Sequence, residues 1–238
     1  MKILTQSFTK ITLLSLFVAL FSISSFAQKG NGDVIKKTFK VESFYGLKIG
    51  GAFFVYLRQG EKHGVTLVTD ANIMENLEVT VNGGVLKIRN DYDMKNPTEL
   101  KAFVTVKDLN NLELSGACTL EGKNTIVTEN LIMKVSGASD IELAVRCSDL
   151  KISASGASDL KLTGDAAVLE IDASGASTIK AEKLLAGQAQ IVGSGAATVK
   201  IDVTESLDAK ASGASTILYR GNASITMNES GASDIKKM

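Results

Sequence analysis

A five-residue motif returns through the second half of the chain at nearly constant spacing. The segment SGASD occupies residues 136–140, 155–159 and 230–234, and near-copies of it begin at Ser115, Ser174, Ser194 and Ser212. Successive copies start 18 to 21 residues apart. Self-similarity at a fixed period of this length indicates a repeat architecture, in which one supersecondary unit stacks on the next.

Apolar and polar residues alternate on both sides of each motif, which predicts two short strands per repeat. Leu150, Ile152 and Ala154 precede Ser155 at every second position. A period of two gives each strand one face to bury, and stacked copies bury these faces together. The competing leucine-rich repeat needs a Leu-x-x-Leu-x-Leu-x-x-Asn consensus, which is absent. We therefore predict an all-β parallel β-helix, or β-solenoid, with about 18–21 residues per turn.

The motif itself is interpreted as a structural corner between the two strands. Its second residue is always glycine, which suits a positive φ or the close approach of a neighbouring backbone. We expect alanine at the third place to fit a crowded interior corner, and serine at the first and fourth places to bond nearby backbone. The fifth place varies between Asp and Thr, which does not suit a catalytic carboxylate. The predicted structural corner residues are Gly116, Gly137, Gly156, Gly175, Gly195, Gly213 and Gly231.

Residues 28–111 follow the same scheme less regularly and are predicted to be a β-rich N-terminal part, continuous with the repeats of residues 112–238. The segment LKIGGAFFVYL, residues 47–57, matches a repeat with Gly50-Gly51-Ala52 at its corner. Asn82-Gly83-Gly84 predicts a hairpin or tight turn, and residues 71–76 one helical turn. Most aromatic residues of the mature chain stand here, and we expect them to fill and cap this end of the coil.

Residues 1–27 are predicted to be a secretory signal peptide. Lys2 and Lys10 precede an apolar stretch, residues 11–23, that is short for a bilayer span, and the small residues Ser25 and Ala27 suit a signal peptidase. No cysteine follows the predicted cleavage site, which argues against a lipid anchor. The mature chain is therefore expected to be exported to the periplasm, outer surface or exterior, without a membrane span.

Charge and cysteine content exclude some classes of partner and leave one question open. The mature chain would carry 24 basic and 26 acidic residues without a basic tract, so we expect no nucleic-acid partner. Export permits a disulfide between Cys118 and Cys147. Their places in the repeat, one in the motif and one in a connection, favour two separately buried thiols.

The ordered motifs resemble a known family. The segment G-A-F-x-V-x-L-x-Q-G, residues 51–60, is followed by D-x-N-x-x-x-x-L, residues 70–77, and then by the tandem S-G-A-S-D units. Over residues 40–238 the chain is similar to the auto-transporter adhesin, head GIN domain family. The resemblance implies a secreted or envelope-associated β-helical protein, and it brings no catalytic residues to positions of this chain.

The residues offer little to catalysis or to cofactors. His63 is the only histidine, so at most one of the motif serines could have a histidine base. The glycines lack the lysine and helix of a phosphate loop. A polysaccharide lyase or hydrolase is the rival on fold grounds, but no cationic cluster is evident and repeated acids form rows in any stack. Calcium between Asp140 and Asp159 is the milder alternative, without the nonapeptide signature of calcium-binding β-rolls. We expect no metal and no cofactor.

We therefore expect a non-catalytic, exported protein of the cell envelope that presents a rigid β-helix to a glycan, an envelope protein or another copy of itself. The alternatives are a glycan-active enzyme and a purely structural periplasmic module. Ligand binding would use the aromatic N-terminal end. Glu229, Lys236 and Lys237 are expected to block edge pairing at the last repeat, which predicts a monomer or weak self-association.

Overall fold

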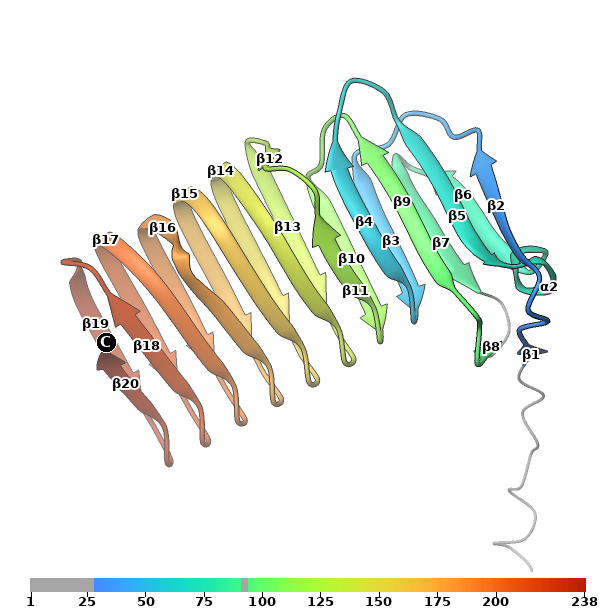
Figure 1. Cartoon of the computed structure of the whole chain (residues 1–238). Coiled ribbons are helices and arrows are strands. Elements are labelled where there is room, and N and C mark those ends of the chain that lie inside the picture. Colours follow the sequence, from blue (N-terminus) through green and yellow to red (C-terminus); the bar gives the residue numbers. More distant parts are fainter. Residues whose placement is uncertain (1–27, 91–93) are drawn as a thin grey trace, which may run out of the picture.

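The chain forms an elongated coil of parallel strands with a cap of antiparallel strands at one end (Figure 1). The computed structural model describes residues 28–90 and 94–238, so the predicted signal peptide lies outside the described residues. The all-β parallel solenoid is confirmed, because each strand of the repeats pairs in parallel with its equivalent one coil away. The repeat strands are β10 (Asn111–Gly116), β11 (Thr119–Gly122), β12 (Ile126–Val127), β13 (Asn130–Val135), β14 (Asp140–Ala154), β15 (Asp159–Ala173), β16 (Thr178–Gly193), β17 (Thr198–Ala211), β18 (Thr216–Arg220), β19 (Ser224–Glu229) and β20 (Asp234–Lys237).

Each coil contributes one segment before its motif corner and one segment after it. We call the segments before the corner the upstream sheet and the segments after it the downstream sheet. The long strands β14 to β17 run from the downstream sheet of one coil into the upstream sheet of the next. The upstream sheet thus contains β10, β13, the second halves of β14 to β17, and β19, and the downstream sheet contains β11, the first halves of β14 to β17, β18 and β20.

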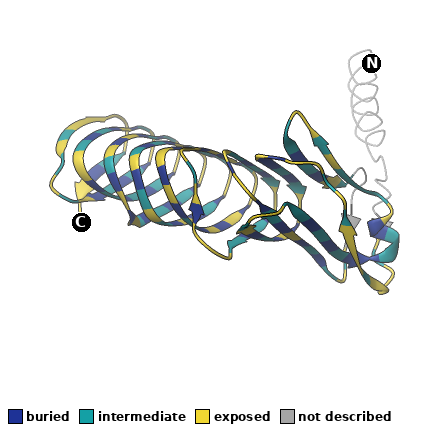
Figure 2. Cartoon of the chain, turned by 90° about the horizontal axis from the view of Figure 1, so that it is seen from above, coloured by how far each residue is buried: buried dark blue, intermediate teal, exposed yellow. Residues whose placement is uncertain are grey.

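The core is a set of apolar rows that run the length of the coil between the two sheets. Alternate residues of each strand point inward, as Figure 2 shows by the alternation of buried and exposed segments. Because the register is kept from coil to coil, Ile141 lies over Leu160 and Leu150 over Leu169. Leu160 and Leu169 have no exposed surface. The pattern of period two therefore predicts this interior correctly.

The N-terminal part does not follow the order of the sequence. The first coil, β3 (Gly46–Gly51) and β4 (Phe54–Gln59), pairs on one side with β10 and β11. On its other side lie β7 (Val85–Asn90) and β9 (Leu100–Val106), which come later in the chain. The chain thus forms the coil of β3 and β4 first and then adds the coil of β7 and β9 on the side toward the cap. It then returns to the other side of the first coil, where β10 and β11 begin the repeats. Gly51 pairs with Gly116, as the match of residues 47–57 to a repeat predicts.

Antiparallel strands close this end of the coil. In the downstream sheet β5 (Gly64–Asp70) pairs with β9, and β2 (Val34–Phe39) pairs with β5. In the upstream sheet β6 (Leu77–Asn82) and β7 form the predicted hairpin, whose two central residues Gly83 and Gly84 both have positive φ. The predicted helical turn is α2 (Ala71–Met74). A short parallel pair, β1 (Gln28–Lys29) and β8 (Met94–Lys95), completes the cap.

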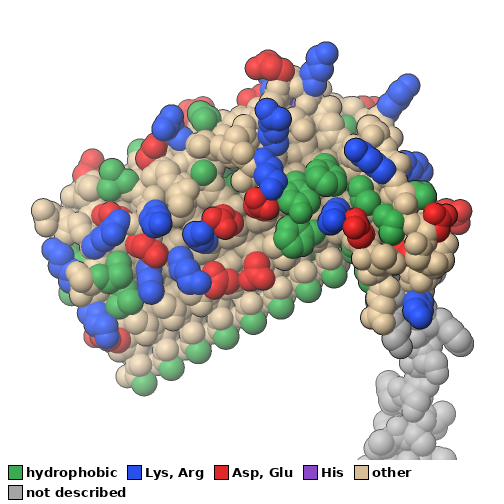
Figure 3. Space-filling model, in the orientation of Figure 1, with side chains coloured by type: hydrophobic (Ala, Val, Ile, Leu, Met, Phe, Trp, Pro, Cys, Tyr) green, Lys and Arg blue, Asp and Glu red, His purple; other side chains and the backbone are tan. Residues whose placement is uncertain are grey.

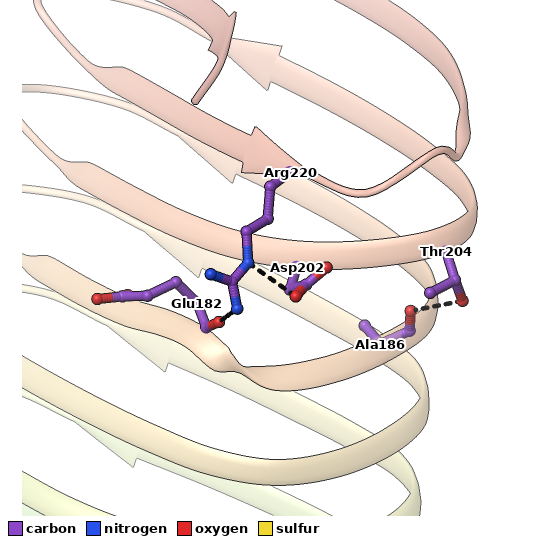
Figure 4. Close-up of polar contacts among 5 residues, drawn as sticks. All are labelled: Glu182, Ala186, Asp202, Thr204 and Arg220. Carbon is purple, nitrogen blue, oxygen red and sulfur yellow. Dashed lines mark hydrogen bonds and ion pairs between the residues drawn. The ribbon is translucent and has the colours of Figure 1, made fainter.

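The corner opposite the motif varies in length, and side chains hold it where it is irregular. The register between β16 and β17 shifts after Ala181 and resumes at Leu185. Arg220 reaches from β18 to this place: its Nε donates to Asp202 Oδ2 at 2.7 Å, and its Nη2 donates to the Glu182 carbonyl (Figure 4). Thr204 Oγ1 donates to the Ala186 carbonyl at 3.2 Å on the same corner.

Candidate interaction surface

The predicted corner glycines lie in one row along an edge of the coil. All seven have φ between +69° and +95°. A Cβ atom added to any of them would stand 2.2 to 2.9 Å from the carbonyl oxygen of the glycine one coil earlier. That carbonyl also accepts a hydrogen bond from the next residue of the motif, as from Ala138 N to Gly116 O at 2.7 Å. The row therefore consists of closely stacked backbone and leaves no space for a ligand.

Alanine at the third motif place is exposed, so the expectation that it fits a crowded interior corner is wrong. Ala138 and Ala157 face solvent, whereas the fourth residues Ser139 and Ser158 are buried. The first three motif residues form an outward tip, and the inward alternation resumes at the fourth. Figure 3 shows this edge as a row of small hydrophobic side chains along the lower margin of the coil.

The fourth-place motif serines bond the corner backbone as predicted, with Ser177 as the exception. Ser158 Oγ donates to the Ser155 carbonyl at 2.8 Å, and Ser215 Oγ donates to the Gly193 carbonyl at 3.1 Å. His63 lies in the turn between β4 and β5, with its ring 4.7 Å from that of Phe44. The geometry therefore offers no serine–histidine pair among these hydroxyls.

Polar residues of the family motifs hold the coil and its cap together. Gln59 bonds two neighbouring segments through its side chain: its Nε2 donates to the Lys107 and Val127 carbonyls at 2.9 Å each, and its Oε1 accepts from Val127 N at 2.7 Å. Its backbone also exchanges two hydrogen bonds of 2.9 Å with the Asn124 side chain. These contacts account for Gln59 by structure alone.

Asp70 fastens the N-terminal segment and a distant loop to the cap. Its buried carboxylate accepts hydrogen bonds from Gly32 N and Thr98 N, at 2.7 Å each, and from Thr98 Oγ1 at 2.8 Å. Burial favours the neutral acid and acts to raise the pKa of Asp70, but the donors of Thr98 and Gly32 outweigh it and lower that pKa. The carboxylate is thus satisfied within the fold and is not aimed at a ligand.

Several acidic side chains of the repeats are paired with lysine or arginine one coil away. Asp140 and Asp159 are neighbours in register, as predicted. Lys180 bonds Asp159 at 2.6 Å, and this hydrogen bond raises the pKa of Lys180. Lys151 bonds Glu170 at 2.6 Å in the same way on the upstream sheet. Within the part of the chain that the structure describes, no three His, Cys, Asp or Glu side chains group so as to hold a metal ion.

The two cysteines are separate, buried free thiols. The Cys118 Sγ lies 3.6 Å from the Gly51 carbonyl inside a motif corner. Burial raises the pKa of the Cys147 thiol to about 11, with a smaller contribution from the charges of Asp149 and Asp165. Neither thiol is prepared for nucleophilic chemistry, because the reactive form is the thiolate.

Exposed aromatic side chains gather on the downstream sheet at the capped end. Phe54 is 41% exposed on β4 and Phe103 is 42% exposed on β9. The Tyr56 ring stacks on Phe103 at a centroid distance of 4.8 Å and lies 5.4 Å from Phe54. The Lys123 ammonium stands 4.4 Å from the Tyr56 ring centroid. We call Phe54, Tyr56 and Phe103 the aromatic surface; Figure 3 shows the hydrophobic cluster on this face of the coil, with charged side chains beside it.

A shallow hollow of about 290 Å³ opens next to Phe54. Two rows of side chains border it, because Phe54 is in register with Thr119 and Asp140, and Tyr56 with Glu121 and Glu142. The sequence predicts aromatic residues at this end but assigns them to filling and capping. Their alternation with buried Val55 and Leu57 is the signal that places Phe54 and Tyr56 outside instead.

Among the described residues, 28–90 and 94–238, no helix has the length and apolarity to cross a membrane. No curated protein matches the chain. A family model described as "Putative auto-transporter adhesin, head GIN domain" matches residues 43–223.

Solved structures of bacterial proteins share the fold, among them three from Bacteroides and Parabacteroides. A protein of Bacteroides fragilis described as a putative adhesin is 25% identical, with a TM-score of 0.83 over 88% of this chain and 99% of that one. A putative adhesin of Parabacteroides merdae is 17% identical, with a TM-score of 0.71 over 88% and 98%. A protein of Parabacteroides distasonis described as a putative lipid binding protein is 20% identical, with a TM-score of 0.68 over 88% and 98%.

Proposed function

Because this chain belongs to the family described as "Putative auto-transporter adhesin, head GIN domain", we propose that it is an exported, non-catalytic module of the cell envelope that binds a surface partner. The contact is the aromatic surface, held on a rigid sheet near the capped end. Export is carried by the predicted signal peptide of residues 1–27. The similar proteins of Bacteroides fragilis and Parabacteroides merdae are themselves described as putative adhesins.

The observation that carries the proposal is the exposure of Phe54 and Phe103 on one face of the coil, where the Tyr56 ring joins them in a single aromatic cluster. Every second residue of β4 and β9 is already buried, so these rings are not needed to fill the interior. Exposed aromatic groups cost solubility and are typical of binding surfaces. A purely structural module would have no use for them, which disfavours that alternative.

Two other functions fit the arrangement less well. A polysaccharide lyase needs a base and cations that neutralise an acidic substrate, whereas the aromatic surface borders Glu121, Asp140 and Glu142. A lipid ligand, as in the description of the Parabacteroides distasonis protein, needs an apolar cavity for its acyl chain. The hollow beside Phe54 is bordered by carboxylates instead.

The proposal is tested by adhesion of the fluorescently labelled chain, without its predicted signal peptide, to fixed bacterial and epithelial cells. The double substitution Phe54→Ala and Phe103→Ala is expected to reduce retention about thirtyfold or more, because truncation of central aromatic contacts typically costs ~2 kcal/mol or more. Ile132→Ala, at an exposed residue of the upstream sheet, is the matched control and should retain full binding. Equal retention of the double variant and the control on every surface would contradict the proposal, as would turnover of an acidic glycan by the wild-type chain.

A further inference from the structure

The hollow beside Phe54 combines one exposed aromatic wall with an excess of negative charge. Phe54 borders it at one end and Lys161 and Asp159 border it at the other, three coils further along. Glu121, Asp140 and Glu142 lie between them. The coils are spaced by ~4.8 Å, which is about the length of one pyranose ring. The hollow therefore has the dimensions of a short stretch of sugar residues laid along the coil axis.

The charges around the hollow do not cancel. Glu121 is paired with Lys123 at 2.6 Å, Glu142 with Lys161 at 2.7 Å, and Asp159 with Lys180 at 2.6 Å. Asp140 forms no ion pair with any residue that the structure describes. Lys180, which pairs directly with Asp159, also interacts with Asp140 at longer range. Four carboxylates thus face three lysines, so a net negative charge remains, and Asp140 stands in the same row as Phe54, with Thr119 between them. A cationic group placed here would be attracted both by the carboxylate and by the face of the aromatic ring.

We infer that this hollow binds an amine-bearing sugar residue of a glycan chain, with the ring of the sugar against Phe54 and its ammonium group at Asp140. The inference rests on the proposed function and names the ligand class of the same surface. The apolar C–H face of a pyranose packs on an aromatic ring, and the sugar hydroxyls find acceptors in Glu121 and Glu142. A uronic acid in the same place would meet uncompensated like charge and be repelled.

A peptide ligand fits the surface less well than a glycan. Extended peptides commonly bind by adding a strand to a free sheet edge. Here β4 is paired on both sides, with β9 and β11, and β11 is paired with β4 and β14. The hollow therefore offers side chains but no free backbone, which suits a rigid ligand that presents hydroxyl and amino groups.

The test compares three short glycans by calorimetry with the chain without its predicted signal peptide: a glucosamine trimer, an N-acetylglucosamine trimer and a galacturonic acid trimer. The glucosamine trimer is expected to bind about tenfold more tightly than the neutral trimer, and its affinity should fall as salt is added, because exposed ion pairs are screened. The galacturonic acid trimer should not bind. A lysine trimer tests whether positive charge alone suffices, and it should bind more weakly than the glucosamine trimer.

Two substitutions separate the aromatic from the ionic contribution. Phe54→Ala should weaken binding of the amino and neutral trimers alike, whereas Asp140→Asn should reduce only the preference for the amino trimer. Asp172→Asn, at an exposed aspartate of the upstream sheet, is the control and should change neither affinity. Both Phe54 and Asp140 are exposed, so the variants should keep the fold, and circular dichroism verifies that they do.

Equal binding of the amino and neutral trimers, binding of the acidic trimer, stronger binding of the lysine trimer, or indifference to Phe54→Ala would each overturn the inference. Adhesion to cells that depends on Phe54 and Phe103, without any binding of the amino trimer, would overturn this inference and leave the proposed function standing. If the amino trimer does not bind and adhesion to cells does not depend on Phe54 and Phe103, the proposed function is refuted as well.

Discussion

At the scale of single residues, the stability of the coil depends on a backbone contact that only glycine permits. The motif tip turns outward through a positive φ and stacks directly on the tip before it. The sequence identifies the glycines but misplaces the alanine, because its small apolar side chain suggests burial. Counting by two from buried Ala154 places Ser158 inside and Ala157 outside, as the structure has them, and only Gly156 at the tip departs from the alternation.

Gly175→Ala should destabilise the protein by ~1–3 kcal/mol, because φ is +71° and the new Cβ would stand 2.6 Å from the Gly156 carbonyl oxygen. Ser174→Ala, at the preceding residue, removes a hydrogen bond of 3.4 Å and should cost ~1 kcal/mol or less. The melting temperatures of the two variants, each compared with the wild type, test this difference. Equal losses of melting temperature would show that the stacked tips do not limit stability.

Two serines at the same motif place should respond differently to removal of the hydroxyl group. Ser158 Oγ donates to the Ser155 carbonyl at 2.8 Å, whereas the buried Ser177 Oγ has no hydrogen-bond partner among the described residues. Ser158→Ala should therefore cost ~1 kcal/mol, and Ser177→Ala should be neutral or stabilising, because an unsatisfied polar group leaves the interior. Chemical denaturation measures both, and a matching loss in Ser177→Ala would contradict the assignment.

The thiols should be inert while the protein is folded. Cys118 is 1% exposed and Cys147 is 8% exposed, and the pKa of Cys147 is raised to about 11, so almost no thiolate exists at neutral pH. A thiol reagent added to the native chain should react with neither cysteine, and it should titrate both after unfolding in denaturant. Rapid modification of the native protein, or only one thiol per chain after unfolding, would be the contrary result.

At the scale of secondary-structure elements, the repeat strands could be predicted from the sequence and the path of the N-terminal strands could not. Leu150, Ile152 and their equivalents define both the faces and the register, since a slip of one residue would expose every one of them. The pairing of β9 with β4 and of β7 with β3 has no such signal, because β7 and β9 carry no motif and lie far from β3 and β4 in the chain. The sequence places ligand binding at the aromatic end but does not bring Phe103 beside Phe54 and Tyr56, because that contact arises only through this crossing.

Acidification should release the cap before the coil. The pKa of Asp70 in the folded protein is lowered from 3.8, so the unfolded state binds a proton more readily and stability rises with pH between the two values. This contribution is present above about pH 4 and is lost as the pH falls through the folded-state value. The protection of the β2 amides from hydrogen exchange, relative to the intrinsic rate at the same pH, should fall over that range. In Asp70→Asn this protection should already be low at neutral pH and vary less with acidification, while Asp33→Asn, at an exposed residue, should behave as the wild type.

At the scale of the whole molecule, the coil is a stack in which each turn contacts only its neighbours, so its energy is close to a sum over turns. The aromatic surface and its hollow use only β4, β9 and the segments from β11 to β15. The turns beyond β16 lengthen the coil and support its last turn, and they do not contribute to this surface. Binding and length are therefore separable properties of this architecture.

Deletion of residues 196–213, one complete turn, should leave a folded and binding-competent protein. Thr178 would then pair with Thr216 through the same register that each now keeps with Thr198. Scattering should show a particle shorter by about one coil spacing, ~4.8 Å, with a lowered melting temperature. Deletion of residues 196–204 alone removes about half a turn and brings strands of opposite sheets together, so it should prevent folding. Loss of structure in both deletions would refute additivity.

The placement of β7 and β9 on the cap side of β3 and β4 also determines the order in which the coils can form when the chain is synthesised from its N-terminus. Leu47 pairs with Leu86 on one side and with Leu112 on the other. The first coil to be synthesised therefore has no neighbouring coil to pack on until most of the first half of the chain has been made. Such long-range closure is slow. Once it is complete, each further turn docks on a finished template with only a short loop to close. Assembly should therefore begin with a delay and then proceed turn by turn, in step with the supply of new chain.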